Sequence, residues 1–284
     1  MNIRPISPKI GAIIDGIDLK VALDESLAKE IRQLLIDYQV IFFKKQSVLT
    51  AEEYIQLVRK IYQPMRHPFI STEKPLVPGI SPFQPYPEYP EITGIYHDRD
   101  NKGNLNEWHS DLNWLEKPSY GSVLRAREVP TVGGDTIFCS MTAAYEDLSP
   151  ELKAQCEHLK AYHDFTPIYQ AMFIEKPNEL RKMQDYYPAQ AHPVILVHPL
   201  SGKKSLFVNR VSSTKILQMA EEESRTLLQI LFNTANKPEY HARYCWEVND
   251  IALWDNLATQ HYAVSDYWPA TRKMERLSLS GILI

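Results

Sequence analysis

The sequence has little of three features that mark particular protein classes: cysteine, clustered basic charge and long apolar runs. Its three cysteines have no metal-binding spacing and cannot all pair, which is typical of a reducing compartment. The net charge is -4 and no block of lysines and arginines occurs, so a nucleic-acid partner is not expected. No apolar run approaches the roughly 18 residues of a membrane span, and the N-terminus lacks a secretory signal pattern. We therefore expect a cytoplasmic protein without membrane or nucleic-acid partners.

What is present indicates a packed core. Hydrophobic residues make up 44% of the 284 residues, and 20 prolines against 10 glycines indicate many loops of fixed backbone. Apolar periodicity predicts helices over 24–38, 150–159 and 221–234. A capping box of Thr50 and Glu53 predicts a further helix that ends near residue 62.

Short strand signals alternate with turns along the rest of the chain. They fall at 40–43, 120–129, 135–139, 193–198, 205–209, 240–248, 250–254 and 272–283. Many short strands with helices outside them predict a mainly β fold with flanking helices, built on a jelly-roll barrel. We find no internal repeat and no linker, so we expect a single domain over residues 1–284.

Two segments interrupt this pattern. Residues 64–107 interleave prolines with aromatic residues, and 165–187 form a tyrosine-rich stretch with the character of a helical insertion. A long loop of such composition is either a lid over a functional site or a poorly ordered excursion. We favour lids for both segments.

The stretch Trp108-His109-Ser110-Asp111 carries the strongest chemical signal. A histidine and a carboxylate two positions apart point to the same side of an extended segment, so they can bind one metal ion together. If the fold brings His261 alongside, two imidazoles and one carboxylate share one face of the metal and leave the opposite positions open. This is the ligand set of non-haem Fe(II) oxygenases.

The other histidines fit a shared metal less well. His192 and His198 lie on one predicted strand, which would separate them by about 20 Å. His241 follows a glutamate by two positions, but no second histidine stands at a matching rim position. We interpret these as hydrogen-bonded or surface histidines, whereas His67 and His97 fall within the first predicted lid and are placed to contact substrate.

The last predicted strand carries Arg272 and Arg276 on one face. Taken alone, such a pair is interpreted as two solvated guanidinium groups, with Glu275 and Asp266 as surface partners. A guanidinium group is, however, the preferred partner of a carboxylate in a dry cavity, which gives Arg272 the weight of a ligand-binding residue.

Four sequence blocks occur in order along the chain. They are W-H-x-D at 108–111, G-G-D-T at 133–136, W-D-N-x-x-x-Q-H-Y at 254–262 and R-x-x-x-R at 272–276. Together they resemble the taurine dioxygenase family of Fe(II)- and 2-oxoglutarate-dependent dioxygenases, which includes 2,4-dichlorophenoxyacetate and alkylsulfatase enzymes. The stretches IGAIIDGIDL and HPVILVHPLSGKKSLFVN resemble it too, so the likeness covers nearly the whole chain. It implies a double-stranded β-helix, a jelly-roll variant that agrees with the strand pattern.

The resemblance also implies the metal and the reaction. His109, Asp111 and His261 would bind Fe(II), and O2 with 2-oxoglutarate as co-substrate would oxidise a substrate C–H bond, giving succinate and CO2. Related halogenases lack the carboxylate to make room for halide. The presence of Asp111 therefore favours hydroxylation, or another oxidation without halide.

The family pattern assigns two further subsites. Arg272 and the Thr136 hydroxyl would hold the distal carboxylate of 2-oxoglutarate, and Arg276 would bind an anionic group of the substrate. The two arginines lie about 13 Å apart on one strand face. One can therefore reach a buried co-substrate while the other faces the entrance.

The substrate itself differs from taurine in this interpretation. An asparagine that contacts substrate in the taurine enzyme is replaced by Leu105, with Asn106 beside it, although His67 resembles a substrate-side histidine of that enzyme. Residues 210–213 depart from the taurine pattern as well. We expect a small anion, namely a sulfonate, sulfate or carboxylate. The alternative is oxidative tailoring of an amino-acid-derived or natural-product substrate by the same chemistry.

Two rival functions use the same residues. A hydrolase could hold Zn2+ on the His/Asp/His set, but nothing in the sequence supports a base beside the zinc-bound water. A barrel that only binds a small ligand has no need for intact His109, Asp111, His261, Thr136 and Arg272 together. Since members of the resembled family are commonly oligomeric, we expect a homo-oligomer that acts on a small molecule.

Overall fold

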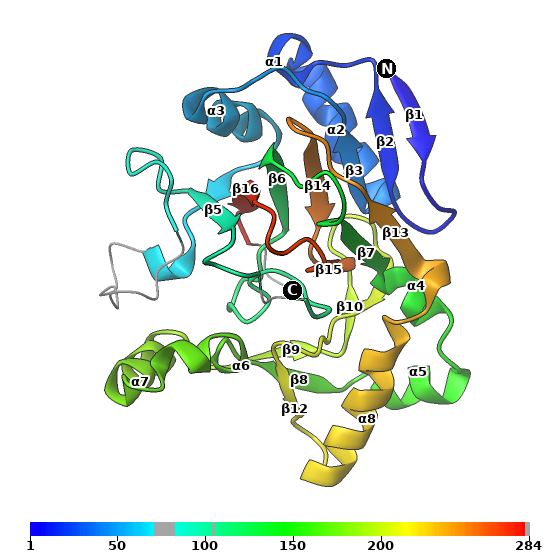
Figure 1. The fold of residues 1–284 in the computed structure, drawn as a ribbon. Helices are drawn as coiled ribbons and strands as arrows, with labels where there is room; N and C mark the ends of the chain where they lie inside the picture. Colours follow the sequence, from blue (N-terminus) through cyan, green and yellow to red (C-terminus); the bar gives the residue numbers. More distant parts are fainter. Residues whose placement is uncertain (71–82, 104–105, 282–284) are drawn as a thin grey trace.

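A central sheet of eight strands runs through the computed structural model, which describes residues 1–70, 83–103 and 106–281 (Figure 1). The strands that follow one path across the sheet are, in order, β1 (Asn2–Pro5), β2 (Ala12–Asp15), β3 (Val40–Phe43), β14 (Ile251–Asp255), β6 (Gly121–Glu128), β16 (Arg272–Leu279) and β4 (Pro64–Met65). The remaining strand, β5 (Ile92–His97), pairs with β16 on the edge that β4 also uses. The long strand β16 is therefore held on both sides, by β6 and by β5.

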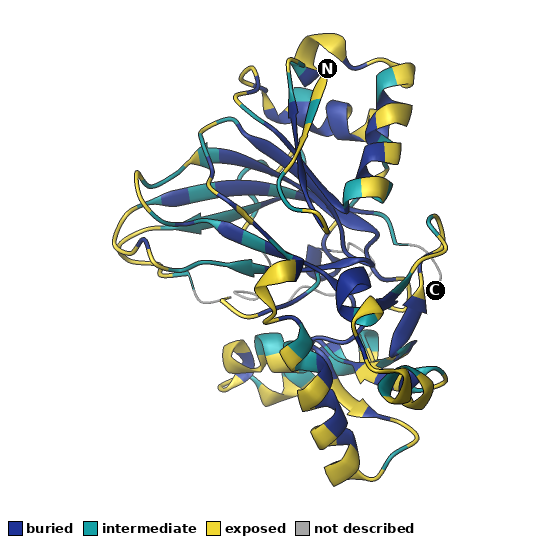
Figure 2. Ribbon diagram, turned by 90° about the vertical axis from the view of Figure 1, so that its right-hand side faces the viewer, coloured by how far each residue is buried: buried dark blue, intermediate teal, exposed yellow. Residues whose placement is uncertain are grey.

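A smaller sheet packs against the inner face of the central one. It contains β13 (His241–Tyr244), β7 (Thr136–Ser140) and β15 (Thr259–Ala263), in that order. One apolar cluster joins the two sheets, with Phe42, Leu124 and Trp254 from the central sheet and Phe138 and Tyr244 from the smaller one. Figure 2 shows this buried interior in dark blue, with the exposed residues on the helices and loops around it.

The N-terminal helices cover the outer face of the central sheet (Figure 1). These are α1 (Leu19–Ala22), α2 (Glu25–Tyr38) and α3 (Ala51–Ile61). Asp24 caps α2, and Thr50 and Glu53 form the predicted capping box on α3, each cap contributing about 1 kcal/mol. The helices bury their apolar stripes against outward-facing residues such as Leu253 and Leu277.

A second lobe lies at the opposite end of the molecule (Figure 1). It contains a three-stranded sheet and a two-stranded sheet, together with most of the remaining helices. The strands are β12 (Ser213–Ile216), β8 (Lys160–His163), β9 (Gln190–Pro193), β10 (Ile195–Val197) and β11 (Lys204–Leu206). The helices of this part of the chain are α4 (Met141–Glu146), α5 (Pro150–Cys156), α6 (Thr166–Tyr169), α7 (Pro177–Tyr186) and α8 (Glu221–Thr234). Among all described residues, 3-10 turns are formed by η1 (Pro68–Ile70), η2 (Gln170–Phe173) and η3 (Pro238–Tyr240).

The predicted mainly β fold with flanking helices is confirmed, and the helices expected at 24–38, 150–159 and 221–234 are present. The prediction of a single strand over 193–198 is wrong. Pro193 has no backbone N–H to continue the ladder, so β9 ends there and β10 begins in a different sheet. The argument that one strand separates His192 from His198 therefore does not apply. His192 Nε2 instead contacts the Leu115 carbonyl oxygen, and His198 Nε2 contacts Asp255.

Part of the first predicted lid is a strand of the central sheet. Residues 92–97 form β5 and pair with β16 over its length from Leu277 to Arg272. Residues 71–82 and 104–105 of that segment lie outside the described residues. No helix in the described part of the chain is long and apolar enough to cross a membrane.

Candidate metal and co-substrate site

His109 and His261 lie side by side between the two sheets. They form an isolated antiparallel bridge, in which the backbone N–H of each donates to the carbonyl of the other at 3.1 and 2.8 Å. Their ring centroids are 4.1 Å apart. Asp111 follows two residues after His109, and one ligand atom from each of the three residues lies within 4.8 Å of the others. The fold thus brings His261 to the H-x-D segment, as the sequence predicted.

The protonation states of this group suit a divalent cation. Burial lowers the pKa of both histidines, that of His261 to about 3, so both imidazoles are neutral at pH 7. The His109 Nδ1–H donates to the Glu107 carbonyl oxygen at 2.7 Å, which leaves the Nε2 lone pair for a metal. Burial opposes ionisation of Asp111, but the nearby Arg276 guanidinium and the Ser122 hydroxyl hold its pKa well below the usual value. Two neutral imidazoles and a carboxylate are the species that bind Fe(II).

The Asp111 carboxylate is held through both oxygens. Arg276 Nη1 donates to Oδ1 at 2.6 Å, and the Ser122 hydroxyl donates to Oδ2 at 2.8 Å. Oδ1 also lies 4.0 Å from His261 Nε2, on the side where a metal would sit. Arg276 supplies a positive charge beside the buried carboxylate.

A cavity of about 360 Å³ opens beside the three residues. It is lined from both sheets and from both predicted lid segments, which contribute Phe83 and Met172 among others. The volume falls in the range of small-molecule sites. Apolar side chains predominate, and the polar groups that reach it include His67, Thr93, Thr136, Arg272 and Arg276.

Arg272 and Thr136 occupy one end of this cavity. Arg272 is 4% exposed, and its Nε donates to the Gly134 carbonyl oxygen at 3.0 Å. Its two terminal nitrogens have no hydrogen-bond partner among the described residues, so they remain available to an anion. The Thr136 hydroxyl accepts from the Trp246 indole at 3.0 Å, which leaves its own hydrogen free to donate. Gly134 has φ +73°, and a Cβ there would lie 3.2 Å from Arg272 Cδ, which explains the glycine in the G-G-D-T block.

Arg276 and His67 occupy a second part of the wall. Arg276 Nε is buried without a hydrogen-bond partner in the described part of the chain. His67 is 2% exposed, and burial together with Arg276 lowers its pKa to about 3. Because its Nδ1 accepts from the Phe69 N–H at 3.2 Å, its Nε2 carries the hydrogen. This end of the cavity therefore offers donors to an anion, beside the metal ligands.

Known proteins share this arrangement of sequence and fold. A family model described as "Taurine catabolism dioxygenase TauD, TfdA family" matches residues 2–278. The chain belongs to the TauD/TfdA family. An alkylsulfatase from Acinetobacter baylyi is 32% identical over 288 residues, which cover 99% of this chain and 85% of the relative. An alpha-ketoglutarate-dependent sulfate ester dioxygenase from Pseudomonas putida is 30% identical, over 99% of this chain and 90% of the relative.

Solved structures agree with the TauD/TfdA assignment. The crystal structure of a taurine dioxygenase from Burkholderia xenovorans matches with a TM-score of 0.79 and 30% identity, over 99% of this chain and 89% of that chain. The protein is thus an Fe(II)- and 2-oxoglutarate-dependent dioxygenase that also uses O2. The zinc hydrolase and the binding-only barrel are not favoured.

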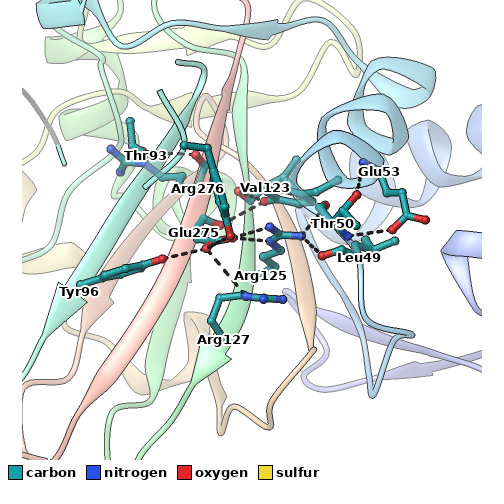
Figure 3. A network of polar contacts seen from close by, with 12 residues as sticks. Leu49, Thr50, Glu53, Thr93, Tyr96, Val123, Arg125, Arg127, Glu275 and Arg276 are labelled. Carbon is teal, nitrogen blue, oxygen red and sulfur yellow. Dashed lines mark hydrogen bonds and ion pairs between the residues drawn. The ribbon is translucent and has the colours of Figure 1, made fainter. Parts of the chain in front are cut away.

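In this TauD/TfdA chain, the expectation that Glu275 and Asp266 are surface partners of the two arginines is wrong. Glu275 is not a surface partner of the two arginines but is 1% exposed. Its Oε2 accepts from Arg125 Nε at 2.6 Å, and its Oε1 accepts from the Tyr96 hydroxyl at 2.8 Å (Figure 3). Oε1 also accepts from the Tyr86 hydroxyl at 2.9 Å. Asp266 is exposed and accepts the Gly134 N–H rather than an arginine.

The structure brings most of the predicted site residues to one cavity, with one exception. Asn106, a predicted substrate contact, is exposed and is not among the residues that line the cavity. Ser122 and Trp246, which contact Asp111 and Thr136, were missed, as were the lining residues Tyr169 and Tyr267. Trp246 is 110 residues from Thr136 in sequence, and Ser122 lies on β6, 11 residues after Asp111. The spacing of residues therefore carries no local signal for these contacts.

Proposed function

We propose that the enzyme binds Fe(II) through His109, Asp111 and His261, and the distal carboxylate of 2-oxoglutarate through Arg272 and Thr136. One observation carries the co-substrate assignment. The two terminal nitrogens of the buried Arg272 have no partner in the described part of the chain, and the Thr136 hydroxyl keeps its hydrogen free to donate. A dianionic co-substrate would satisfy both groups, with charge-assisted hydrogen bonds of about 1.5–3 kcal/mol each.

The substrate is proposed to be a sulfate ester or sulfonate with an apolar body. Arg276 Nε and the Nε2–H of His67 offer donors to the anionic group, while Phe83, Tyr169 and Met172 line the cavity farther along. The relatives named as an alkylsulfatase and a sulfate ester dioxygenase support this substrate class. Asn106 is left out of the proposed site because it lies away from the cavity.

With O2 as the oxidant, bound Fe(II) and 2-oxoglutarate would supply the chemistry that oxidises a substrate C–H bond, one oxygen atom going to succinate, which forms with CO2, and the other to the substrate. The protein would bind and orient the reactants. Arg276 and His67 would fix one end of the substrate so that the C–H bond next to the anionic group faces the metal ligands. The apolar lining would exclude water from the remaining space.

We further propose the finer points that the sequence predicted. The two sheets packed face to face form a jelly-roll core in a single domain, and Met172 from 165–187 and Phe83 from 64–107 act as parts of lids, since both line the cavity. Hydroxylation as the outcome, the cytoplasmic location, the absence of membrane and nucleic-acid partners, and the homo-oligomeric state stay predictions from the sequence and the family.

The test has two stages. Anaerobic Fe(II)-loaded protein is titrated with 2-oxoglutarate, and a weak visible metal-to-ligand charge-transfer band is expected that is absent in His261→Ala. Linear alkyl sulfates, alkyl sulfonates and the matching neutral alcohols are then compared for succinate production. Hydroxylation at the carbon that bears the ester oxygen gives an unstable product that breaks down to aldehyde and free sulfate, so sulfate release should equal succinate. Equal turnover of the neutral alcohols would contradict the anionic substrate class and favour a natural-product substrate.

A further inference from the structure

Behind the Asp111 carboxylate lies a polar chain that no sequence motif announced. Ser122, on β6, is 0% exposed and donates from Oγ to Asp111 Oδ2 at 2.8 Å. The other oxygen, Oδ1, is the one that faces His261 Nε2. The two oxygens of this carboxylate are therefore in different surroundings. One faces the metal-binding side and the other is turned toward β6.

The direction of each hydrogen bond in the chain is fixed by the Trp254 indole. Its Nε1–H can only donate, and it lies 2.9 Å from the Asn256 side-chain oxygen. That assigns the Asn256 Nδ2 group to the Ser122 side, where it lies 3.4 Å from Oγ. Ser122 accepts there and must send its own hydrogen to Asp111. The Asn256 oxygen also receives the Asp111 backbone N–H at 3.3 Å. All four residues are buried.

We propose that Ser122, backed by Asn256, is a positioning residue that keeps Asp111 a one-oxygen metal ligand by holding Oδ2 away from the metal. The inference rests on the proposed metal role of His109, Asp111 and His261. Three ligand atoms from the protein and two from 2-oxoglutarate leave one of six octahedral positions for O2. A carboxylate that turned to bind through both oxygens would occupy that position. Arg276 is no obstacle, since Oδ1 has two lone pairs and can serve a metal and a guanidinium together.

The test compares Ser122→Ala with Ser119→Ala in the full-length protein. Both serines are 0% exposed, and alanine removes only the hydroxyl from each. Ser119 Oγ contacts the carbonyl oxygens of Gly121 and Leu279 at 2.9 Å and has no contact with a metal ligand. Removal of either hydroxyl should lower thermal stability to a similar extent, so both variants should fold. Only Ser122→Ala should change the metal site.

The readout is anaerobic titration with Co(II), which reports affinity and coordination number without turnover. Ser122→Ala should weaken Co(II) binding about tenfold, as expected for a lost contact to a metal ligand. Its visible d–d absorption should also change, because an Asp111 bound through both oxygens alters the ligand geometry around the metal. Ser119→Ala should match the wild type in both. If Ser122→Ala keeps wild-type affinity and spectrum, or if Ser119→Ala changes them equally, the inference is overturned. Failure of the proposed metal site itself would appear separately, as wild-type protein whose Co(II) binding survives His261→Ala.

Discussion

Strand β16 carries charged side chains on both faces, and the two faces pair them differently. On the outer face, Glu275 accepts hydrogen bonds from three side chains. Arg125 lies on β6, Tyr96 lies on β5, and Tyr86 lies in the segment before β5. On the inner face, Arg272 gives one hydrogen bond to a backbone carbonyl, and Arg276 has a buried Nε without a partner among the described residues. Glu275 and Arg125 form a buried ion pair within the chain, whereas Arg272 has no ion-pair partner among the described residues and Arg276 pairs through one nitrogen only, with Asp111.

The difference separates a structural charge from one that awaits a ligand. A buried ion must be paired, because an unpaired charge in the interior costs several kcal/mol. The outer network meets this requirement with protein groups alone, and it ties the start of α3 to the sheet, since Arg125 also donates to the Leu49 and Thr50 carbonyl oxygens (Figure 3). The inner face leaves donor nitrogens without a partner among the described residues beside a cavity, which supports the proposed binding of anions there.

The sharpest way to break the outer network is Glu275→Ala. It leaves Arg125 buried without its carboxylate and removes the acceptor of two tyrosine hydroxyls, so the free energy of unfolding should fall by about 3–5 kcal/mol. Urea denaturation measures the change. Tyr96→Phe, which removes one hydroxyl and leaves the ion pair intact, should cost only about 1 kcal/mol. If the two variants lose equal stability, Glu275 is not the centre of the network.

On the inner face, Arg272→Ala should change co-substrate binding rather than stability. Loss of charge-assisted hydrogen bonds worth about 1.5–3 kcal/mol raises the KM for 2-oxoglutarate about 10- to 100-fold. The unfolding free energy should not fall in step, because the variant also removes a buried cation that lacks an ion-pair partner. Steady-state kinetics and urea denaturation of the same preparation check both parts. An unchanged KM would show that the co-substrate site is assigned wrongly.

A smaller effect is expected for Arg276→Gln. One of its donors already serves Asp111, so fewer remain for the substrate anion. The KM for an alkyl sulfate should rise about tenfold, equivalent to about 1.4 kcal/mol, while the KM for 2-oxoglutarate stays within a factor of two or so. The comparison with Arg272→Ala is the control, because the two variants should affect different ligands. A shift in both KM values by the same factor would mean that the arginines share one ligand.

The sequence predicted the inner face of β16 better than the outer one. Arg272 and Arg276 belong to a spaced block, and the period of two in a strand places them on one face whatever the rest of the chain does. The same rule places the proposed metal ligands His109 and Asp111 on one side, because they are two residues apart. His261 required the family resemblance, since nothing local shows that β15 lies beside residue 109.

The outer network could not be predicted from local pattern. Glu275 and Arg125 are 150 residues apart in sequence and meet only because β16 pairs with β6. From the local sequence alone, Glu275 between Arg272 and Arg276 is interpreted as a solvated charge. The same limit hid Ser122, whose contact with Asp111 depends on how β6 passes behind the H-x-D segment. Spacing rules thus identify groups on one element, whereas contacts between elements need the fold.

The smallest change in unfolding free energy is expected for an exposed ion pair on the same strand. This pair tests whether burial makes the Glu275 network costly to break. Lys273 Nζ lies 2.8 Å from Glu128 Oε2, with 41% and 48% of the two side chains exposed. Like Glu275 and Arg125, these residues are a cation and an anion on β16 and β6. Water already solvates both charges, so Lys273→Ala should change the unfolding free energy by less than about 1 kcal/mol, and added salt should reduce the change further. Urea denaturation at low and high salt measures this. A loss as large as that of Glu275→Ala would mean that pairing across the two strands, and not shielding from water, makes the outer network costly to break.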